Sequence, residues 1–347
     1  LNATGDTALG NAANGIDILN SPANVIGGDS PSDRNVISGN TANGVLITGA
    51  ISTGNVLIGN YIGLDVSGTI DLGNSDNGVL ITSGAHNNRI GTDGNGVNDT
   101  AERNVISGNT DLFSEANVNI IDAHNNIVAG NYIGTNAAGT SALVTTGRGV
   151  RVAAGATFNT IGTDGSADTF NASERNVVSG NTGAGIFITT NSDDNTVAGN
   201  YVGLNAAGDA VIGNGEVGIS VDGSQRTLIG TNADGTADAF ESNVVAGSAG
   251  AGIQIAGSQF TTIAGNLIGL NPAGTIAMPN QGGGVLLGNA AINNTIGGTS
   301  PAERNVISGN TGDGVSIIRV FNSTTLQPSP DNNIVGNFIG TDITGTA

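Results

Sequence analysis

The chain has 347 residues, of which 58 are Gly and 47 are Asn, and both residues weaken helices and favour turns. This composition therefore excludes a protein built mainly from α-helices. A net charge of −19, with nine basic residues that are all Arg, disfavours binding to nucleic acids and to anionic membranes. The absence of Cys excludes disulfides and thiol chemistry, and no apolar run approaches the roughly 20 residues of a membrane-spanning helix.

Short apolar segments recur along the chain in a fixed order. Each unit begins with Gly and an apolar–x–apolar triplet, first at residue 15 and then every 29 to 39 residues. A second segment, N-x-I or N-x-V, follows it, and the third segment alternates between two forms. One form reads NVISGN, as at 35–40, and the other reads GNYIG, as at 59–63. These alternating segments are too short for helices and predict strands of about 3 to 5 residues.

One of the ten copies of the Gly motif, NVNI, has Asn117 in place of Gly. Because Asn is the non-Gly residue that best tolerates a left-handed backbone, we expect Asn117 to hold that conformation at a turn.

Two kinds of loop connect the units. A loop of 14 residues follows each GNYIG-type segment, at 64–77, 135–148, 204–217 and 270–283. It carries Asp or Asn in its second place and Gly in its fifth, which is typical of a type I β-turn. The other loop varies from 6 to 12 residues, at 28–33, 92–102, 163–174, 231–241 and 298–303.

Three strands per unit, repeated ten times without helices between them, predict an all-β fold. We expect a right-handed parallel β-helix, a solenoid of about ten coils with no significant helix. Residues 1–347 should form a single domain of five two-coil repeats, processed out of or excerpted from a longer protein. Turn asparagines should stack in one column and hydrogen-bond from coil to coil, with Ser248 as the one break. This predicted asparagine ladder consists of Asn40, Asn60, Asn109, Asn131, Asn181, Asn200, Asn266, Asn310 and Asn337.

The string NYIGLDVSGTIDLGNSDNGVLITSGAHNNRIGT, followed by ERNVISGN, resembles the parallel β-helix repeats of large secreted bacterial proteins in the pectin-lyase-like superfamily. The resemblance covers essentially the whole chain. That superfamily includes polysaccharide lyases, hydrolases and epimerases as well as adhesive surface proteins. Within that superfamily, long arrays of near-identical coils are more typical of surface and adhesive modules, so the resemblance implies such a module at the cell surface or outside the cell.

Acidic and amide residues are spaced two apart around Gly at 92–99, 163–168 and 231–238, as in oxygen-rich Ca²⁺ loops, and two of these loops supply candidate ligands. The candidate ligands are Asp93, Asn95 and Asp99 in the first loop and Asn232, Asp234 and Asp238 in the second. Neither loop ends in the bidentate Glu of an EF-hand, and Asp-Gly is also common in ordinary turns. Ca²⁺ is thus the cofactor that the sequence suggests, although the fold requires none.

Most other charged residues belong to the repeat, and a catalytic site would occur once. The acidic residue and Arg before NVISGN, as in Glu102-Arg103, predict turn stabilisation or surface ion pairs. At the position of Tyr61, Tyr132 and Tyr201, other copies have Leu267 and Phe338, which indicates apolar packing.

These features favour a non-enzymatic extracellular rod, stalk or fibre subunit with a structural or adhesive role, and they leave enzymatic activity open. The alternative is a β-helix that binds or degrades polysaccharide through its variable loops. Expected partners are further copies stacked end to end, adjacent domains of a longer chain, or surface glycans, but not nucleic acid or membrane.

Overall fold

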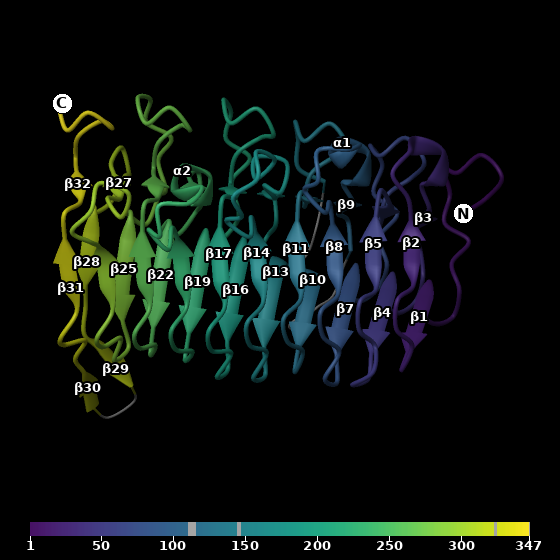
Figure 1. The fold of residues 1–347 in the computed structure, drawn as a ribbon, viewed down its shortest axis with the longest axis horizontal. Coiled ribbons are helices and arrows are strands. Elements are labelled where there is room, and N and C mark those ends of the chain that lie inside the picture. Colours follow the sequence, from purple (N-terminus) through teal and green to yellow (C-terminus); the bar gives the residue numbers. More distant parts are fainter. Residues whose placement is uncertain (110–115, 144–146, 323–324, 347) are drawn as a thin grey trace.

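Three parallel β-sheets run along the whole molecule. The computed structural model describes residues 1–109, 116–143, 147–322 and 325–346. Each sheet has ten strands, and every coil contributes one strand to each sheet, in chain order (Figure 1). The chain is a right-handed parallel β-helix, which confirms the predicted fold and its ten coils of three strands.

The first sheet contains the Gly-motif segments, the second sheet the N-x-I or N-x-V segments, and the third sheet both forms of the third segment. The first sheet is formed by β1 (Ile16–Leu19), β4 (Val45–Thr48), β7 (Val79–Thr82), β10 (Ala116–Ile121), β13 (Arg148–Ala153), β16 (Ile186–Thr189), β19 (Ile219–Asp222), β22 (Ile253–Ala256), β25 (Val285–Gly288) and β28 (Val315–Ile317). The second sheet is formed by β2 (Val25–Gly27), β5 (Val56–Ile58), β8 (Arg89–Gly91), β11 (Ile127–Ala129), β14 (Thr160–Gly162), β17 (Thr196–Ala198), β20 (Leu228–Gly230), β23 (Thr262–Ala264), β26 (Thr295–Gly297) and β31 (Asn333–Val335). The third sheet is formed by β3 (Val36–Ile37), β6 (Tyr61–Ile62), β9 (Val105–Ile106), β12 (Tyr132–Ile133), β15 (Val177–Val178), β18 (Tyr201–Val202), β21 (Val244–Val245), β24 (Leu267–Ile268), β27 (Val306–Ile307) and β32 (Phe338–Ile339).

Helices in the described part of the chain are single turns in the variable loops. They are η1 (Pro31–Asp33), α1 (Asp99–Glu102) and α2 (Asp238–Glu241). None of these is long and apolar enough to span a membrane.

The sequence analysis missed an antiparallel hairpin. It consists of β29 (Val320–Asn322) and β30 (Thr325–Gln327) and projects from the body near the C-terminus (Figure 1). Repeat periodicity could not reveal it, because this insertion has no counterpart in the other coils.

Columns of aliphatic side chains fill the interior. Val45, Val79, Val150 and Ile186 are fully buried, and they occupy the same register position in β4, β7, β13 and β16. Val118 of β10 completes this column between Val79 and Val150. The stacking explains why a core without Trp is sufficient, since like residues pack on like residues from coil to coil.

The asparagine ladder exists, but its predicted members lie in two columns rather than one. Asn40, Asn109, Asn181 and Asn310 lie at the turn between the third and first sheets, where they alternate with Asn74, Asn214 and Asn280. Ser248 takes the place of a ladder Asn between Asn214 and Asn280, and its backbone N–H donates to the Asn280 side chain. Asn60, Asn131, Asn200, Asn266 and Asn337 lie at the turn between the second and third sheets, where they alternate with Asn104, Asn176, Asn243 and Asn305. The difference arises because NVISGN and GNYIG occupy the same sheet in alternate coils, but the last Asn of NVISGN follows its strand whereas the Asn of GNYIG precedes its strand.

A third ladder, which the sequence analysis did not predict, lies at the turn between the first and second sheets. Its members hydrogen-bond side chain to side chain between successive coils over long stretches: Asn24, Asn55, Asn88, Asn126, Asn159 and Asn195, and then Asn294 and Asn332. Each of the three turns between sheets therefore has its own column of amides.

The expectation that Asn117 holds a left-handed backbone was wrong. Asn117 is a buried residue of strand β10, and it is not among the residues with positive φ. The equivalent Gly residues are also outside the left-handed region; they are needed because a Cβ would strike an aliphatic side chain of the third sheet and, in most copies, the backbone carbonyl of the next coil. A Cβ on Gly78, for example, would lie 2.5 Å from a methyl group of Ile106, 2.6 Å from the carbonyl oxygen of Asn117 and 2.7 Å from the side-chain nitrogen of Asn109.

The coil that begins with β10 has no Asn at the ladder position of the turn between the third and first sheets. The corresponding residue there is Thr145, which lies outside the described residues. The Asn117 side chain accepts a hydrogen bond from Asn109 and donates one to Asn181, so that it bridges the gap in the ladder.

Candidate functional site

The variable loops and the 14-residue loops lie along one long edge of the molecule (Figure 1). The 14-residue loops have the predicted turn: in the loop at 64–77, the N–H of Gly68 donates to the carbonyl of Asp65 at 3.0 Å. The N–H groups of Thr69 and Ile70 also donate to the Asp65 carboxylate, both at 2.9 Å. The repeated Asx and Gly residues thus order this loop, as their spacing predicted.

The first candidate Ca²⁺ loop connects β8 to α1. The Asp93 carboxylate accepts hydrogen bonds from the backbone N–H and the side-chain amide of Asn95, at 3.1 and 2.8 Å. The side-chain oxygen of Asn95 accepts the N–H of Val97, and the Asp99 carboxylate accepts the N–H of Gly96. The predicted ligands therefore form a chain of Asx turns, and the structure brings Asp93 and Asp99 together.

Glu102 is the member of this cluster that the sequence analysis did not assign. Its carboxylate is 5% exposed and accepts the Thr92 hydroxyl at 2.9 Å and the Asp93 N–H at 3.0 Å. Asp93, Asp99 and Glu102 each offer one carboxylate oxygen within 4.8 Å of the others. Three converging carboxylates could hold a hard cation such as Ca²⁺, which prefers oxygen ligands.

The second candidate loop connects β20 to α2. It resembles the first loop, but an amide replaces one of its carboxylates. Asn232 stands where the first loop has Asp93, and its N–H donates to the buried carboxylate of Glu241 at 3.0 Å. Asp238, like Asp99, accepts the N–H of a Gly three residues earlier. With one carboxylate replaced by an amide, this loop does not form a second group of three acidic ligands in the described residues.

A row of stacked Arg side chains runs beside these loops, outside the third sheet. In four of the five two-coil repeats, the Arg before the third-sheet strand places its guanidinium carbon 4.0 to 4.2 Å from the centre of an aromatic ring in the next coil. Its Nε also donates to a Gly carbonyl at 3.1 Å. The pairs in this guanidinium row are Arg34 with Tyr61, Arg103 with Tyr132, Arg175 with Tyr201 and Arg304 with Phe338.

The row explains the repeated acidic residue and Arg. The acidic side chain holds its own loop, as Glu102 does, while the Arg packs on the aromatic ring. Turn stabilisation is therefore confirmed as the role of the Glu, and Tyr61 and Tyr201, at 9% and 8% exposure, are packed as the sequence analysis expected.

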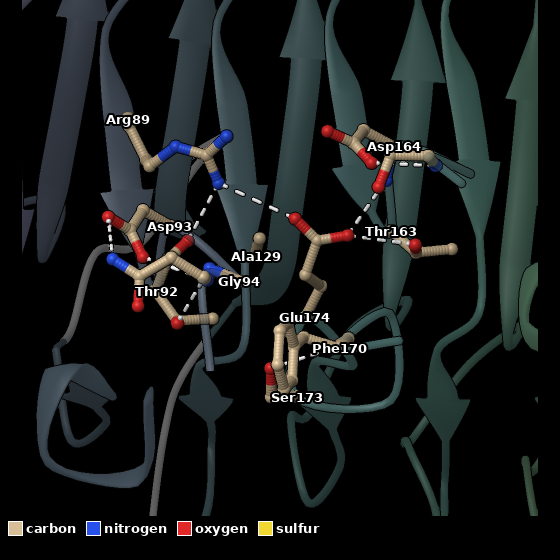
Figure 2. Close-up of polar contacts among 12 residues, drawn as sticks. Arg89, Thr92, Asp93, Gly94, Ala129, Thr163, Asp164, Phe170, Ser173 and Glu174 are labelled. Carbon is tan, nitrogen blue, oxygen red and sulfur yellow. Dashed lines mark hydrogen bonds and ion pairs between the residues drawn. The ribbon is translucent and has the colours of Figure 1, made fainter. Parts of the chain in front are cut away.

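The ion pair between Arg89 and Glu174 has no counterpart in the other described repeats. Arg89 of β8 donates to the Thr92 carbonyl at 2.7 Å, and it reaches past β11 to the Glu174 carboxylate at 3.7 Å (Figure 2). Glu174 in turn accepts the Thr163 hydroxyl and the Asp164 N–H, at 2.8 and 3.1 Å. Arg89 thus links two successive variable loops. Sequence analysis could not find this contact, because the partners are 85 positions apart and do not recur together.

Glu241 and Glu303 occupy the same position in their repeats, but their pKa values are shifted in opposite directions. Burial raises the pKa of Glu241, and the nearby Asp238 and Asp234 charges raise it further against the hydrogen bonds from Thr231 and Asn232. Hydrogen bonds from the backbone and side chain of Ser300 lower the pKa of Glu303.

These shifts predict opposite pH dependences for two Gln variants. Stability linked to Glu241 is complete below its usual pKa and is lost as pH rises through the raised value, so Glu241→Gln should gain stability relative to the parent as pH rises from about 4 to 7. Stability linked to Glu303 is present above its usual pKa and is lost as pH falls through the lowered value, so Glu303→Gln should lose stability relative to the parent as pH rises from about 3 to 5. Urea unfolding at several pH values measures both. Parallel curves for the two variants would contradict the assigned shifts.

No family model matches the chain, and no curated protein matches it. Among solved structures, a mutant of the periplasmic alginate epimerase AlgG is 14% identical with a TM-score of 0.45, over 88% of this chain and 50% of that one. The Dettilon tailspike protein is 16% identical with a TM-score of 0.35, over 84% of this chain and 55% of that one. The chain thus spans about half the length of these structures, and similarity at this level carries no information about activity.

Proposed function

We propose that the protein is a non-enzymatic extracellular rod with a structural or adhesive role. The observation that carries this proposal is the repetition of the same coil-to-coil contacts along the whole array. Three columns of amides and columns of Val and Ile join each coil to its neighbours. Such an array makes a stiff, linear body in which each coil contacts only its neighbours, as in other solenoids.

The use of the repeated polar groups also supports the proposal. Glu102, Glu174 and Glu241 each accept hydrogen bonds from their own loop, and the Arg residues of the guanidinium row pack on aromatic rings. These groups act in holding the scaffold together. The rod would space or display its loops at regular intervals along one edge.

Electron microscopy of the purified chain, combined with depolymerisation assays, tests this function. At about 4.8 Å per coil, ten coils should give a rod roughly 50 Å long. Either discrete rods or rods joined end to end would agree with a structural role, provided that a panel of neutral and acidic polysaccharides remains intact. Cleavage of any of these polymers at ordinary enzymatic rates would support the polysaccharide-degrading alternative and overturn the proposal.

We further propose that the rod binds Ca²⁺ at Asp93, Asp99 and Glu102. Binding to the folded state alone should raise the melting temperature by a few degrees in millimolar Ca²⁺ relative to a chelator. Asp99→Asn should abolish this rise. Asp238→Asn is the matched control, because it changes the equivalent residue in the loop that lacks the third carboxylate, and it should keep the rise. Identical melting of the parent chain in Ca²⁺ and chelator would contradict the proposal.

A further inference from the structure

The guanidinium row has one vacant position. Aromatic or apolar row residues lie in β6, β12, β18, β24 and β32, which are every second strand of the third sheet and therefore about 9.6 Å apart. In the repeat of β21 and β24, Ser242 replaces the Arg and Leu267 replaces the aromatic ring. Both members of the stack are thus missing from the same place.

A cavity of about 480 Å³ lies at this place. It is lined by Ser242 and Leu267 and, on either side, by Arg175 over Tyr201 and by Arg304. Asp238 from α2 also lines the cavity. The cavity exists because Ser242 and Leu267 are smaller than the Arg and the aromatic residue of the other repeats, while the strands on either side keep their regular spacing.

The vacant position keeps the acceptor that a guanidinium uses elsewhere in the row. In the four intact copies, the Arg Nε donates to the carbonyl of Gly59, Gly130, Gly199 or Gly336. The equivalent carbonyl belongs to Gly265, which lines the cavity, and no donor among the described residues bonds to it. This is a backbone acceptor left open at the wall of a hollow.

Charge at the vacant position also favours a cation. The other four repeats have one acidic residue and one Arg before the third-sheet strand, whereas this repeat keeps Glu241 and has no Arg. Asp238 lines the cavity, on a chain whose net charge is −19, whereas the Glu241 carboxylate is turned to its own loop, where it accepts the Asn232 N–H. A bound guanidinium would restore the balance of one positive and one negative charge found in the other repeats. It would lie as far from Arg175 and Arg304 as the other guanidinium groups of the row lie from one another.

We propose that this cavity binds a guanidinium group, carried by an arginine side chain of a partner polypeptide. The group would donate to the Gly265 carbonyl, lie over Leu267 and pair with Asp238. This site goes beyond the rod function, which needs no ligand, and it does not depend on that function.

Titration of the full chain with N-acetylarginine amide, followed by nuclear magnetic resonance, tests the site. The uncharged citrulline analogue is the control ligand and should bind at least tenfold more weakly. Ser242→Arg fills the vacant position from within and should weaken binding of the arginine probe at least tenfold. Ser32→Arg adds the same charge at an exposed position in another variable loop and should leave binding unchanged.

A second variant is expected to gain affinity, which a misfolded protein could not do. Leu267→Tyr restores the ring beneath the guanidinium and should raise the affinity for the arginine probe several-fold, as a cation–π contact does. Equal binding of the arginine and citrulline probes, or unchanged binding to Ser242→Arg, would overturn the proposal. So would binding of glucuronate in place of the arginine probe, since an anion would then be the ligand of Arg175 and Arg304.

Discussion

Replacing Asn200 with Ala should lower the free energy of unfolding by about 3 kcal/mol or more, because several buried polar groups would lose their partners together. Asn200 is fully buried in the ladder between the second and third sheets. Its amide donates to the carbonyls of Ile161 and Ala198, at 2.8 and 3.0 Å, and to the Asn243 side chain at 3.0 Å. Its oxygen accepts the Asn176 amide at 2.9 Å. Urea unfolding followed by circular dichroism measures the loss.

Asn337→Ala is the matched control, in the last coil of the same ladder. Asn337 makes equivalent bonds to the carbonyls of Ile296 and Val335, at 2.8 and 3.1 Å, but it is only half-buried. Water can reach the groups that this substitution releases, so we expect a loss of about 1 kcal/mol or less. Equal losses for the two variants would show that burial of the ladder does not determine its contribution.

Gly162→Ala should destabilise the protein by about 3 kcal/mol or more, because the methyl group meets backbone as well as an unfavourable φ. Gly162 ends β14 at φ +111°, and a Cβ there would lie 1.7 Å from the carbonyl oxygen of Ala198 in the next coil. The two coils would have to separate to accept it. Thermal and urea unfolding of the variant measure the effect.

Gly155 in the same coil separates the two causes. It also has a positive φ, of +80°, but no heavy atom lies within 4 Å of a Cβ built there. Gly155→Ala should therefore cost only the backbone strain, about 1 kcal/mol. If both variants lost the same stability, the close approach of successive coils would not be the reason for Gly162.

Both predictions concern the property on which the proposed function depends, which is uninterrupted stacking of coils. Where stacking is interrupted, the chain compensates or leaves a cavity. Asn117 bridges the coil that lacks a ladder Asn, whereas Ser242 and Leu267 leave the guanidinium row open. The vacant position is therefore a local departure in an otherwise regular scaffold, which makes it the better candidate for recognition.

The repeating pattern alone was enough to predict the fold. The Gly motif, the N-x-I segment and the alternating NVISGN and GNYIG segments each became a strand, because their periodicity matches a pleated strand and their spacing matches one turn of a solenoid. The Asx and Gly residues of the 14-residue loops likewise act within a few residues of each other. Local chemistry of this kind can be predicted from neighbours in the sequence.

Contacts between coils were decided only by the three-dimensional stacking. The predicted single ladder divided into two, and Asn117 bonded Asn181 rather than forming a turn, because the register of whole coils determines which amides meet. Glu102 joined Asp93 and Asp99 through the path of a loop that varies in length from repeat to repeat. The ion pair of Arg89 with Glu174 and the cavity beside Ser242 depend on side chains one or more coils apart. A one-dimensional pattern shows that a residue departs from the repeat, but only the stacked structure shows what space and which partners that departure leaves.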